Sequence, residues 1–286
     1  MCLPAVAFTT VDGTRIRYAH SAGRGKPSIL LTSPWPESIY AFAAIWPLLT
    51  PRFRLFAVDL PGFGGSARRD ELLSPEAMGT FLARLIEECG LDHPHVVGPD
   101  VGTAAALFAA ASRPDLVSSV VVGGGGACVP IRLGDPLEEW VLAPDLDRLR
   151  AVDPRAIVGA TLDTIEGDAL PVEIREDYLD SYDGERFVES MRYVRSYPTE
   201  LAKLAQRLPG IETPVQIIAG GRDRIVPLVN AEFLAERLPR STLTMVDSGH
   251  FAWEEVPGEY ASIITAWVER GQSQELTTIL RASSSG

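Results

Sequence analysis

The chain has 286 residues, of which 46% are hydrophobic and 22% are charged. This composition is ordinary for a globular protein, and the length allows one large domain or a core with a smaller insertion. The formal net charge of −12 argues against nucleic acid or an anionic membrane as a partner, because binding to phosphate groups requires a basic protein face.

Cysteine and lysine usage narrows the chemistry further. Cys2, Cys89 and Cys128 are odd in number and widely spaced, so neither a disulfide framework nor a zinc site with cysteine ligands is expected. Lys26 and Lys203 are the only lysines, which argues against a catalytic Schiff base. We therefore expect a protein without a bound metal or cofactor.

The sequence predicts no targeting segment and no membrane segment. Its first residues, MCLPAVAFTTVDG, lack the basic start and the long apolar run of a signal peptide. No stretch approaches the roughly 18 apolar residues of a membrane helix. A cytoplasmic protein is the default expectation, and its oligomeric state is left open between a monomer and a homodimer.

The predicted elements alternate along the chain. Residues 6–9 and 14–18 flank an Asp-Gly turn and predict an antiparallel hairpin. Short apolar runs then predict buried parallel strands over residues 28–32, 55–58, 95–97, 118–122, 215–218 and 242–246. Helical patterns cover residues 40–49, 74–89, 101–111, 228–238 and 260–268. This alternation predicts an α/β fold, with a mostly parallel sheet and helices on both faces.

Residues 128–207 interrupt this alternation. The segment is acidic and helical and has no convincing buried strand, so we interpret it as a helical cap inserted over the sheet. The α/β core is then formed by residues 1–127 and 208–271. Residues 272–286 end in Ser-Ser-Ser-Gly, which predicts a flexible C-terminal tail.

The stretch VVGPDVG, residues 96–102, places a carboxylate at a sharp turn. An apolar strand followed by a tight turn and a helix is the context of a nucleophile elbow, written G-x-S-x-G when the nucleophile is serine. Here the serine position holds Asp100. Gly98 and Gly102 remove side chains that would crowd the turn, and the amide of Val101 can donate to an oxyanion. The alternative is that Asp100 is a helix N-cap.

Two further motifs supply an acid and a base. GGRDRIVP follows one predicted strand and contains Asp223, and DSGHFAWEE follows the next strand and contains His250. A nucleophile, an acid and a histidine in this chain order are typical of α/β-hydrolases. Alone, His250 could be a histidine of a surface loop. Asp12, Asp59 and Asp247 are rival acids, but only Asp223 lies at the expected offset after a late strand.

The stretch TSPWPES ends another predicted strand. The backbone amide of Trp35 could complete an oxyanion hole with the amide of Val101. Pro34 and Pro36 fix the path of the chain, and the Trp35-Pro36 bond is a candidate for the cis form. The alternative is a proline-rich turn in which Trp35 is packed without a catalytic role.

Together these motifs resemble the α/β-hydrolase superfamily over nearly the whole chain. The resemblance is greatest to the branch with an aspartate nucleophile, which includes epoxide hydrolases and haloalkane or haloacetate dehalogenases. The matching pieces are PES, DLPGFGGS, GPDVG, GGRD and GHFAWEE. The glycines of GFGG belong to this pattern, and no ribose-binding acid follows them at the right place, which excludes a dinucleotide fingerprint.

The type of nucleophile restricts the substrate. A serine that attacked a saturated carbon would form an inert ether, whereas a carboxylate forms an alkyl ester that water can hydrolyse. An aspartate at the elbow therefore predicts a small apolar substrate, either an epoxide or an alkyl halide. In the expected mechanism Asp100 displaces the leaving group, and His250, oriented by Asp223, activates the water that hydrolyses the ester.

An epoxide requires an acid to protonate its oxygen, and similar epoxide hydrolases use paired tyrosines from the cap. The candidates in this cap are Tyr178, Tyr182, Tyr193 and Tyr197. RFVESMRYVR resembles the segment with the second acid tyrosine, although Val194 stands where that tyrosine is expected. These features predict an epoxide hydrolase.

The sequence also departs from this branch at two places. Val101 replaces the tryptophan or arginine that usually follows the nucleophile, and Ser33-Pro34 replaces the usual His-Gly. A haloalkane or haloacetate dehalogenase and a specialised-metabolite hydrolase or cyclase therefore remain alternatives. A degenerate hydrolase that only binds a ligand is the non-enzymatic alternative.

Overall fold

The protein is built around one sheet of eight strands in the order β1-β2-β4-β3-β5-β6-β7-β8. A computed structural model describes residues 4–283, and side chains are described for residues 4–271. The strands are β1 (Val6–Val11), β2 (Thr14–His20), β3 (Ser28–Thr32), β4 (Arg54–Val58), β5 (His95–Pro99), β6 (Ser119–Gly123), β7 (Val215–Gly220) and β8 (Ser241–Val246). Only β2 pairs antiparallel, with β1 and with β4; the other pairs are parallel. The predicted α/β fold is confirmed.

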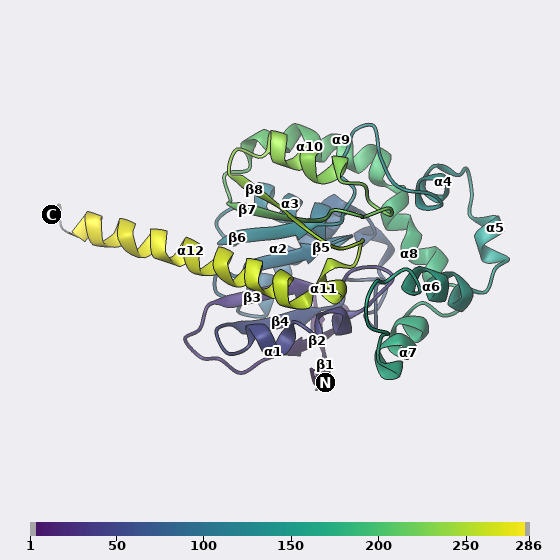
Figure 1. Ribbon diagram of the computed structural model, residues 1–286, viewed down its shortest axis with the longest axis horizontal. Coiled ribbons are helices and arrows are strands. Elements are labelled where there is room, and N and C mark those ends of the chain that lie inside the picture. Colours follow the sequence, from purple (N-terminus) through teal and green to yellow (C-terminus); the bar gives the residue numbers. More distant parts are fainter. Residues whose placement is uncertain (1–3, 284–286) are drawn as a thin grey trace.

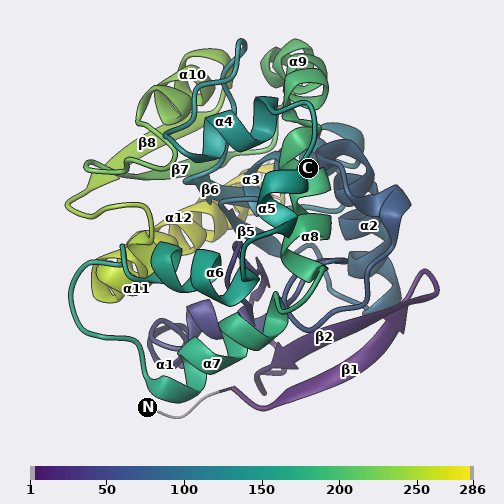
Figure 2. The same cartoon turned by 90° about the vertical axis from the view of Figure 1, so that its right-hand side faces the viewer.

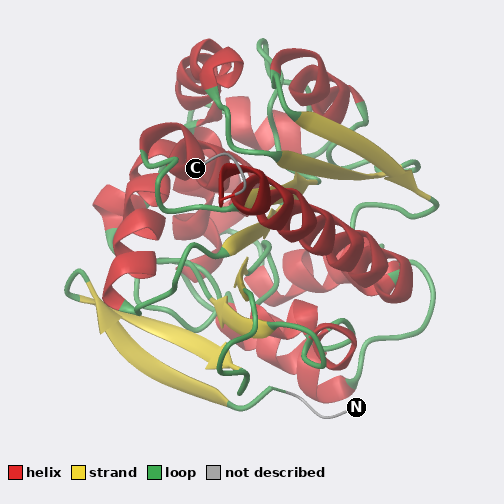
Figure 3. Ribbon diagram, turned by 90° about the vertical axis from the view of Figure 1, so that its left-hand side faces the viewer, coloured by secondary structure: helices red, strands yellow, loops and turns green. Residues whose placement is uncertain are grey.

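Helices cover both faces of the sheet, as Figures 1 and 3 show. One face packs against α2 (Pro75–Glu88), α3 (Gly102–Ser112) and α10 (Val229–Arg237). The other face packs against α1 (Trp46–Leu49), α11 (Ala252–Glu255) and α12 (Pro257–Ser283). Because both faces are covered, strands such as β5, β6 and β7 are buried throughout, which explains their continuous apolar runs.

The prediction of one helix over residues 40–49 is wrong. A short 3₁₀ helix, η1 (Ile39–Phe42), is followed by the single turn of α1. Pro47 lies in the first turn of α1, where its missing N–H is tolerated, but inside a continuous helix it would remove a backbone hydrogen bond. The helix that was expected from residue 74 is found, and the Ser74 hydroxyl caps it by accepting from the Ala77 N–H.

The segment 128–207 contributes six helices between β6 and β7. They are α4 (Leu137–Leu142), α5 (Asp147–Arg150), α6 (Pro154–Leu162), α7 (Val172–Ser181), α8 (Arg186–Arg195) and α9 (Tyr197–Arg207). Two 3₁₀ turns lie elsewhere, η2 (Asp70–Leu72) and η3 (Leu208–Gly210). Figure 2 shows α4 to α8 in front of the sheet, on the side toward which the parallel strands run. We call residues 128–207 the helical segment.

A buried arginine joins the helical segment to the sheet. Arg17 of β2 donates from Nε to the carboxylate of Asp59, and its two terminal nitrogens bind the carboxylate of Asp177 on α7. Asp59 is fully buried and also accepts from the amides of Ile39 and Gly65. This network fixes α7 against the loops at the carboxyl ends of the strands.

Helix α12 begins against the sheet and extends beyond it. Its first turns bury Tyr260, Ala261, Ile264 and Val268, and Figure 1 shows the helix continuing past the edge of the body. The predicted tail over residues 272–286 starts within this helix, and residues 284–286 lie outside the described residues. In the described part of the chain, no helix combines the length and apolar character that crossing a membrane requires.

Candidate active site

The turn between β5 and α3 holds Asp100 in a backbone conformation that few residues other than glycine adopt. Its φ is +51°, in the left-handed region where a residue other than glycine is uncommon. The Asp100 N–H donates to the Gly123 carbonyl at 2.8 Å, and the Asp100 carbonyl accepts from the Thr103 N–H at 2.9 Å. Neighbouring backbone therefore keeps the turn in the form of a nucleophile elbow.

The glycines on either side of the elbow are required by close packing. A Cβ on Gly98 would lie 2.7 Å from the carbonyl oxygen of Gly102. A Cβ on Gly102 would collide with the hydroxyl of Thr32 on β3. The crowding expected from the sequence is thus present, and it explains why neither position carries a side chain.

The structure brings Asp100, His250 and Asp223 together at the carboxyl ends of the strands. Nδ1 of His250 lies 2.8 Å from Oδ2 of Asp223, and Nε2 lies 3.9 Å from Oδ1 of Asp100. Oδ1 of Asp223 accepts from the amides of Ile225 and Val226, each at 2.8 Å. Asp223 is therefore fixed as the acceptor that orients the imidazole.

The rival aspartates are engaged elsewhere. Asp59 belongs to the buried network with Arg17. Asp12 pairs with Arg69 and Arg84 beside the hairpin, and Asp247 pairs with Arg222 at an exposed site. Of the acids considered from the sequence, only Asp223 bonds to His250.

A backbone amide holds one oxygen of the Asp100 carboxylate. The Trp35 N–H donates to Oδ2 of Asp100 at 2.6 Å, and the Val101 amide also lowers the pKa of this carboxyl group. The Trp35-Pro36 bond is cis, in agreement with the sequence expectation. The Trp35 amide thus occupies the position of an oxyanion-hole donor, with Oδ2 of Asp100 as its acceptor.

The surroundings of Asp100 and His250 shift the pKa values of both side chains. Burial raises the pKa of Asp100 to about 6, against the opposing effects of His250 and of the Trp35 and Val101 amides. Burial by itself lowers the pKa of His250, but the charge and hydrogen bond of Asp223 outweigh it and raise the pKa overall. A buried acid and a buried base with shifted pKa values are typical of a catalytic site.

A cavity of about 90 Å³ opens onto Asp100 and His250. Its other walls are mainly apolar and come from the oxyanion-hole loop, the helical segment and the loops after β7 and β8: Trp35, Pro36, Gly134, Asp135, Pro136, Leu137, Trp140, Thr161, Phe187, Ile225 and Phe251. A cavity of this size accepts a small molecule, and its lining favours an apolar one.

None of the four candidate tyrosines lines this cavity. The hydroxyl of Tyr178 donates to Oε1 of Glu254 at 2.7 Å, and that of Tyr182 donates to the Glu37 carbonyl at 2.9 Å. Both rings are fully buried. These hydroxyls therefore join the helical segment to the core instead of facing a substrate.

Tyr193 and Tyr197 pack against each other. The Tyr193 hydroxyl donates to the carbonyl of Val101 at 2.8 Å. Tyr197 packs edge-on against the Tyr193 ring, with 5.9 Å between their centroids. None of the four tyrosines therefore lines the cavity above Asp100, and tertiary packing directs the hydroxyls of Tyr178, Tyr182 and Tyr193 to partners in interfaces between elements.

The sequence analysis missed a buried pair of carboxyl groups beside the triad. Glu37 accepts from Nε1 of Trp253 at 3.1 Å, and Glu254 accepts from the Tyr178 hydroxyl at 2.7 Å. Burial and the charge of Glu254 raise the pKa of Glu37 well above its usual value. Glu37 stands in the PES motif that contributed to the resemblance, so a signal for this residue was present.

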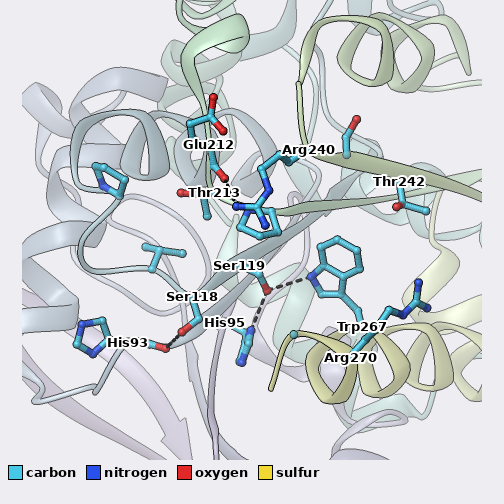
Figure 4. A pocket seen from close by; sticks show the side chains of 15 residues that line it. His93, His95, Ser118, Ser119, Glu212, Thr213, Arg240, Thr242, Trp267 and Arg270 are labelled. Carbon is cyan, nitrogen blue, oxygen red and sulfur yellow. Dashed lines mark hydrogen bonds between the residues drawn. The ribbon is translucent and has the colours of Figure 1, made fainter. Parts of the chain in front are cut away.

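A larger cavity lies at the opposite edge of the sheet. Figure 4 shows His95, Ser119 and Trp267 on its wall, where Ser119 hydrogen-bonds to both neighbours. The cavity measures about 1010 Å³ and lies at the amino ends of β5 to β8, with no triad residue in its lining. We base no function on it, because ligands of α/β folds bind at the carboxyl ends of the strands.

No group of three or more His, Cys, Asp and Glu side chains within the described part of the chain is arranged to hold a metal ion.

Comparison with known proteins identifies the family. The model of the Alpha/beta hydrolase family matches residues 20–263, so the chain belongs to this family. It is similar to the uncharacterized hydrolase YugF of Bacillus subtilis (strain 168), with 25% identity over 260 residues, 87% of this chain and 92% of YugF. The fold and the family together define a hydrolase of the α/β type.

Two further similarities concern particular activities. A soluble epoxide hydrolase of Corynebacterium sp. (strain C12) is 32% identical over 112 residues, which cover 39% of this chain and 38% of that protein. The crystal structure of haloalkane dehalogenase DbeA from Bradyrhizobium elkani USDA94 superposes with a TM-score of 0.79 at 21% identity, covering 94% and 99% of the two chains. The second similarity shows a shared fold alone.

Proposed function

We propose that this protein hydrolyses a small apolar substrate through an alkyl ester formed on Asp100. The observation that carries the proposal is the hydrogen bond from the Trp35 amide to Oδ2 of Asp100, while Oδ1 lies toward His250. In an enzyme with a serine nucleophile, an amide at this place binds an oxygen of the substrate. Here the Trp35 amide binds an oxygen of the proposed nucleophile itself, which supports a tetrahedral intermediate centred on Asp100.

The two steps of the proposed reaction use different atoms of the same carboxylate. Oδ1 attacks a saturated carbon and the leaving group departs with the electron pair of its bond to that carbon, which leaves an ester on Asp100. His250 then takes a proton from water, and the hydroxide attacks the ester carbon. The amides stabilise the charge that develops on Oδ2. Collapse of this intermediate breaks the ester bond, and protonated His250 gives its proton to the departing alkoxide, which leaves as the alcohol product.

An epoxide is the first candidate substrate. The partial relative that is named a soluble epoxide hydrolase supports this choice, together with the motifs shared with that branch. Opening an epoxide also requires a proton for the leaving oxygen. Because none of the four tyrosines lines the cavity, this candidate requires a different proton donor or a different arrangement of the helical segment.

An alkyl halide is the second candidate, and the cavity lining favours it. A halide needs no proton, only a dry pocket with a hydrogen-bond donor. Trp140 lines the cavity, and its indole N–H has no hydrogen-bond partner within the described part of the chain. The surrounding walls are mainly apolar, which suits a leaving group of low charge density.

Single turnover in water enriched in ¹⁸O tests the ester mechanism. With a panel of small terminal epoxides and 1-haloalkanes, we expect ¹⁸O in the tryptic peptide that contains Asp100 and none in the first-turnover product. Diol formation with the epoxides identifies the first candidate, and halide release identifies the second. Label in the product instead of the peptide would show direct attack by water and would overturn the proposal.

The Asp100→Asn variant distinguishes catalysis from binding alone. If the protein only binds ligands, wild type and variant bind the same probes equally and neither turns them over. The proposal expects turnover by the wild type and its loss in the variant, with both chains folded as judged by circular dichroism.

A further inference from the structure

Helix α8 of the helical segment reaches the side chain of one oxyanion-hole residue. The indole Nε1–H of Trp35 donates to the hydroxyl of Ser190 at 2.8 Å. That hydroxyl donates in turn to the Phe187 carbonyl at 2.7 Å, one turn earlier in α8. The Phe187 ring stacks on the Trp35 indole, with 5.3 Å between centroids and 16° between planes. Helix α8 thus contacts the Trp35 indole twice, through a hydrogen bond at Nε1 and through stacking on one face of the ring.

The same helix reaches the second oxyanion-hole residue. The hydroxyl of Tyr193 donates to the carbonyl of Val101 at 2.8 Å. Val101 is the residue that precedes the first turn of α3 and follows Asp100 directly. Tyr193 therefore bonds to the backbone at the start of α3, immediately after Asp100.

Ser190 and Tyr193 are three residues apart, so they lie on one face of α8. Both are almost completely buried, at 1% and 0% exposure, so water does not compensate for the loss of either bond. One helical face thus contacts both Trp35, whose amide binds Oδ2 of Asp100, and Val101, whose amide lowers the pKa of that carboxyl group.

We propose that Ser190 and Tyr193 are positioning residues through which α8 sets the geometry of the oxyanion hole. The inference rests on the proposed function, since that function gives the two amides their role. Its consequence is that a displacement of α8 and a displacement of the Trp35 and Val101 amides are coupled.

The two half-reactions respond differently to a disturbed hole. Before attack, the amides stabilise a charged carboxylate oxygen, and this charge decreases as the ester forms. During ester hydrolysis the charge on the same oxygen grows, so the amides stabilise that transition state most strongly. Weakening the hole is therefore expected to slow hydrolysis while leaving alkylation nearly unchanged or faster. A general loss of structure would slow both.

The kinetic test compares Ser190→Ala and Tyr193→Phe with two matched controls. Ser262→Ala removes a hydroxyl that also donates to a carbonyl of the preceding turn, and Tyr260→Phe removes a buried hydroxyl remote from the hole. The probes are 1,2-epoxyhexane and 1-bromobutane, followed by intact-protein mass spectrometry. We expect about tenfold slower ester hydrolysis in the two test variants, accumulation of the alkyl-enzyme, and wild-type behaviour in both controls.

A substrate-free test follows the ionisation of Asp100 through the backbone amide signal of Trp35 in ¹H–¹⁵N spectra. The Trp35 and Val101 amides lower the pKa of Asp100, which is about 6 in the wild type. Weakening of this effect should therefore move the titration midpoint upward in Ser190→Ala and in Tyr193→Phe. A Trp35→Phe, Ser190→Ala double variant should show no more than the larger single effect, because both changes break one bond.

The outcomes separate this inference from the proposed function. If both midpoints move upward while no probe alkylates the wild type, the proposed function fails and the coupling stands. If the wild type turns over a probe but both midpoints and both half-reactions match the controls, the coupling is wrong. Should Tyr193→Phe fail to fold, Ser190→Ala alone still decides between these outcomes.

Discussion

Asp223 is the residue on which the orientation of the proposed base depends. Replacing it by asparagine should reverse the hydrogen-bonding character of the group that faces Nδ1 of His250 and favour the wrong tautomer. We expect Asp223→Asn to reduce turnover by a factor on the order of 10³ to 10⁴, measured with a probe that the wild type accepts. Asp247→Asn is the matched control, because its carboxylate is exposed and distant from the imidazole. Equal losses of turnover in the two variants would show that Asp223 does not have this role.

The pH dependence of the two steps follows from the shifted groups. Asp100 must be ionised to attack, and its pKa is raised to about 6, so the rate of ester formation should fall about tenfold per pH unit below that value. His250 must be neutral to activate water, and its pKa is raised, so ester hydrolysis should also decline as the pH falls. Because the two groups interact, the apparent values belong to the pair. Rapid-quench measurements from pH 5 to 9 check this, and an alkylation rate that is flat below pH 7 would contradict it.

Ser33 offers a stability test beside the oxyanion hole. Its side chain is fully buried, and its hydroxyl has no hydrogen-bond partner within the described residues. Ser33→Ala should therefore raise the free energy of unfolding by about 1 kcal/mol, as the cost of an unpaired buried hydroxyl disappears. Ser66→Ala should lower it by a similar amount, because that hydroxyl bonds to Arg17 and Asp59. Urea denaturation measures both, and destabilisation by Ser33→Ala would show that the hydroxyl has a partner after all.

At the scale of elements, the network around Arg17 joins β2, α7 and the loop after β4. Arg17→Leu would leave the Asp59 carboxylate buried without its counter-charge and would release Asp177 of α7. We expect a loss of about 3 to 5 kcal/mol in the free energy of unfolding. Arg52→Leu breaks an exposed ion pair instead and should cost no more than about 1 kcal/mol. Equal effects in the two variants would contradict the importance of this network.

The elements that the sequence predicted well are those with a strong local signal. Parallel strands buried on both faces produce continuous apolar runs, so each predicted strand lies within about two residues of the observed one. Asp100, Asp223 and His250 could be predicted to lie together because each comes shortly after a strand whose carboxyl end lies at the same edge of the sheet. The single helix expected over residues 40–49 was wrong because Pro47 is tolerated in the first turn of a helix but not in its interior.

The helical segment was harder to predict because docking decides which face of each helix meets the core. Sequence showed four tyrosines in this segment but could not show that Tyr178, Tyr182 and Tyr193 donate to groups outside the cavity. Ser190 carries no sequence signal at all, since its role arises only from the approach of α8 to Trp35. Contacts between distant segments are set by tertiary packing, which local patterns do not encode.

At the scale of the whole molecule, α12 divides into a packed part and a part that extends past the sheet (Figure 1). The buried residues described on this helix end at Val268. We expect truncation after Gly271 to leave the thermal midpoint within about 2 °C of wild type and turnover unchanged. Differential scanning calorimetry checks the first, and light scattering of both chains shows whether the extension determines a monomer or a dimer. A large loss of stability would assign a structural role to residues 272–286.

Because a carboxylate oxygen occupies the oxyanion hole, the protein should react with a different class of covalent reagents than serine esterases do. Sulfonyl fluorides and phosphonofluoridates disable serine esterases by forming a bond to an alkoxide, and the hole then binds the oxygen that they carry. In this protein the elbow offers a carboxylate, and the Trp35 amide is already bound to it. Reagents that label serine esterases in a cell extract should therefore pass this protein over, whereas electrophiles built on a strained ring or a carbon–halogen bond should mark it.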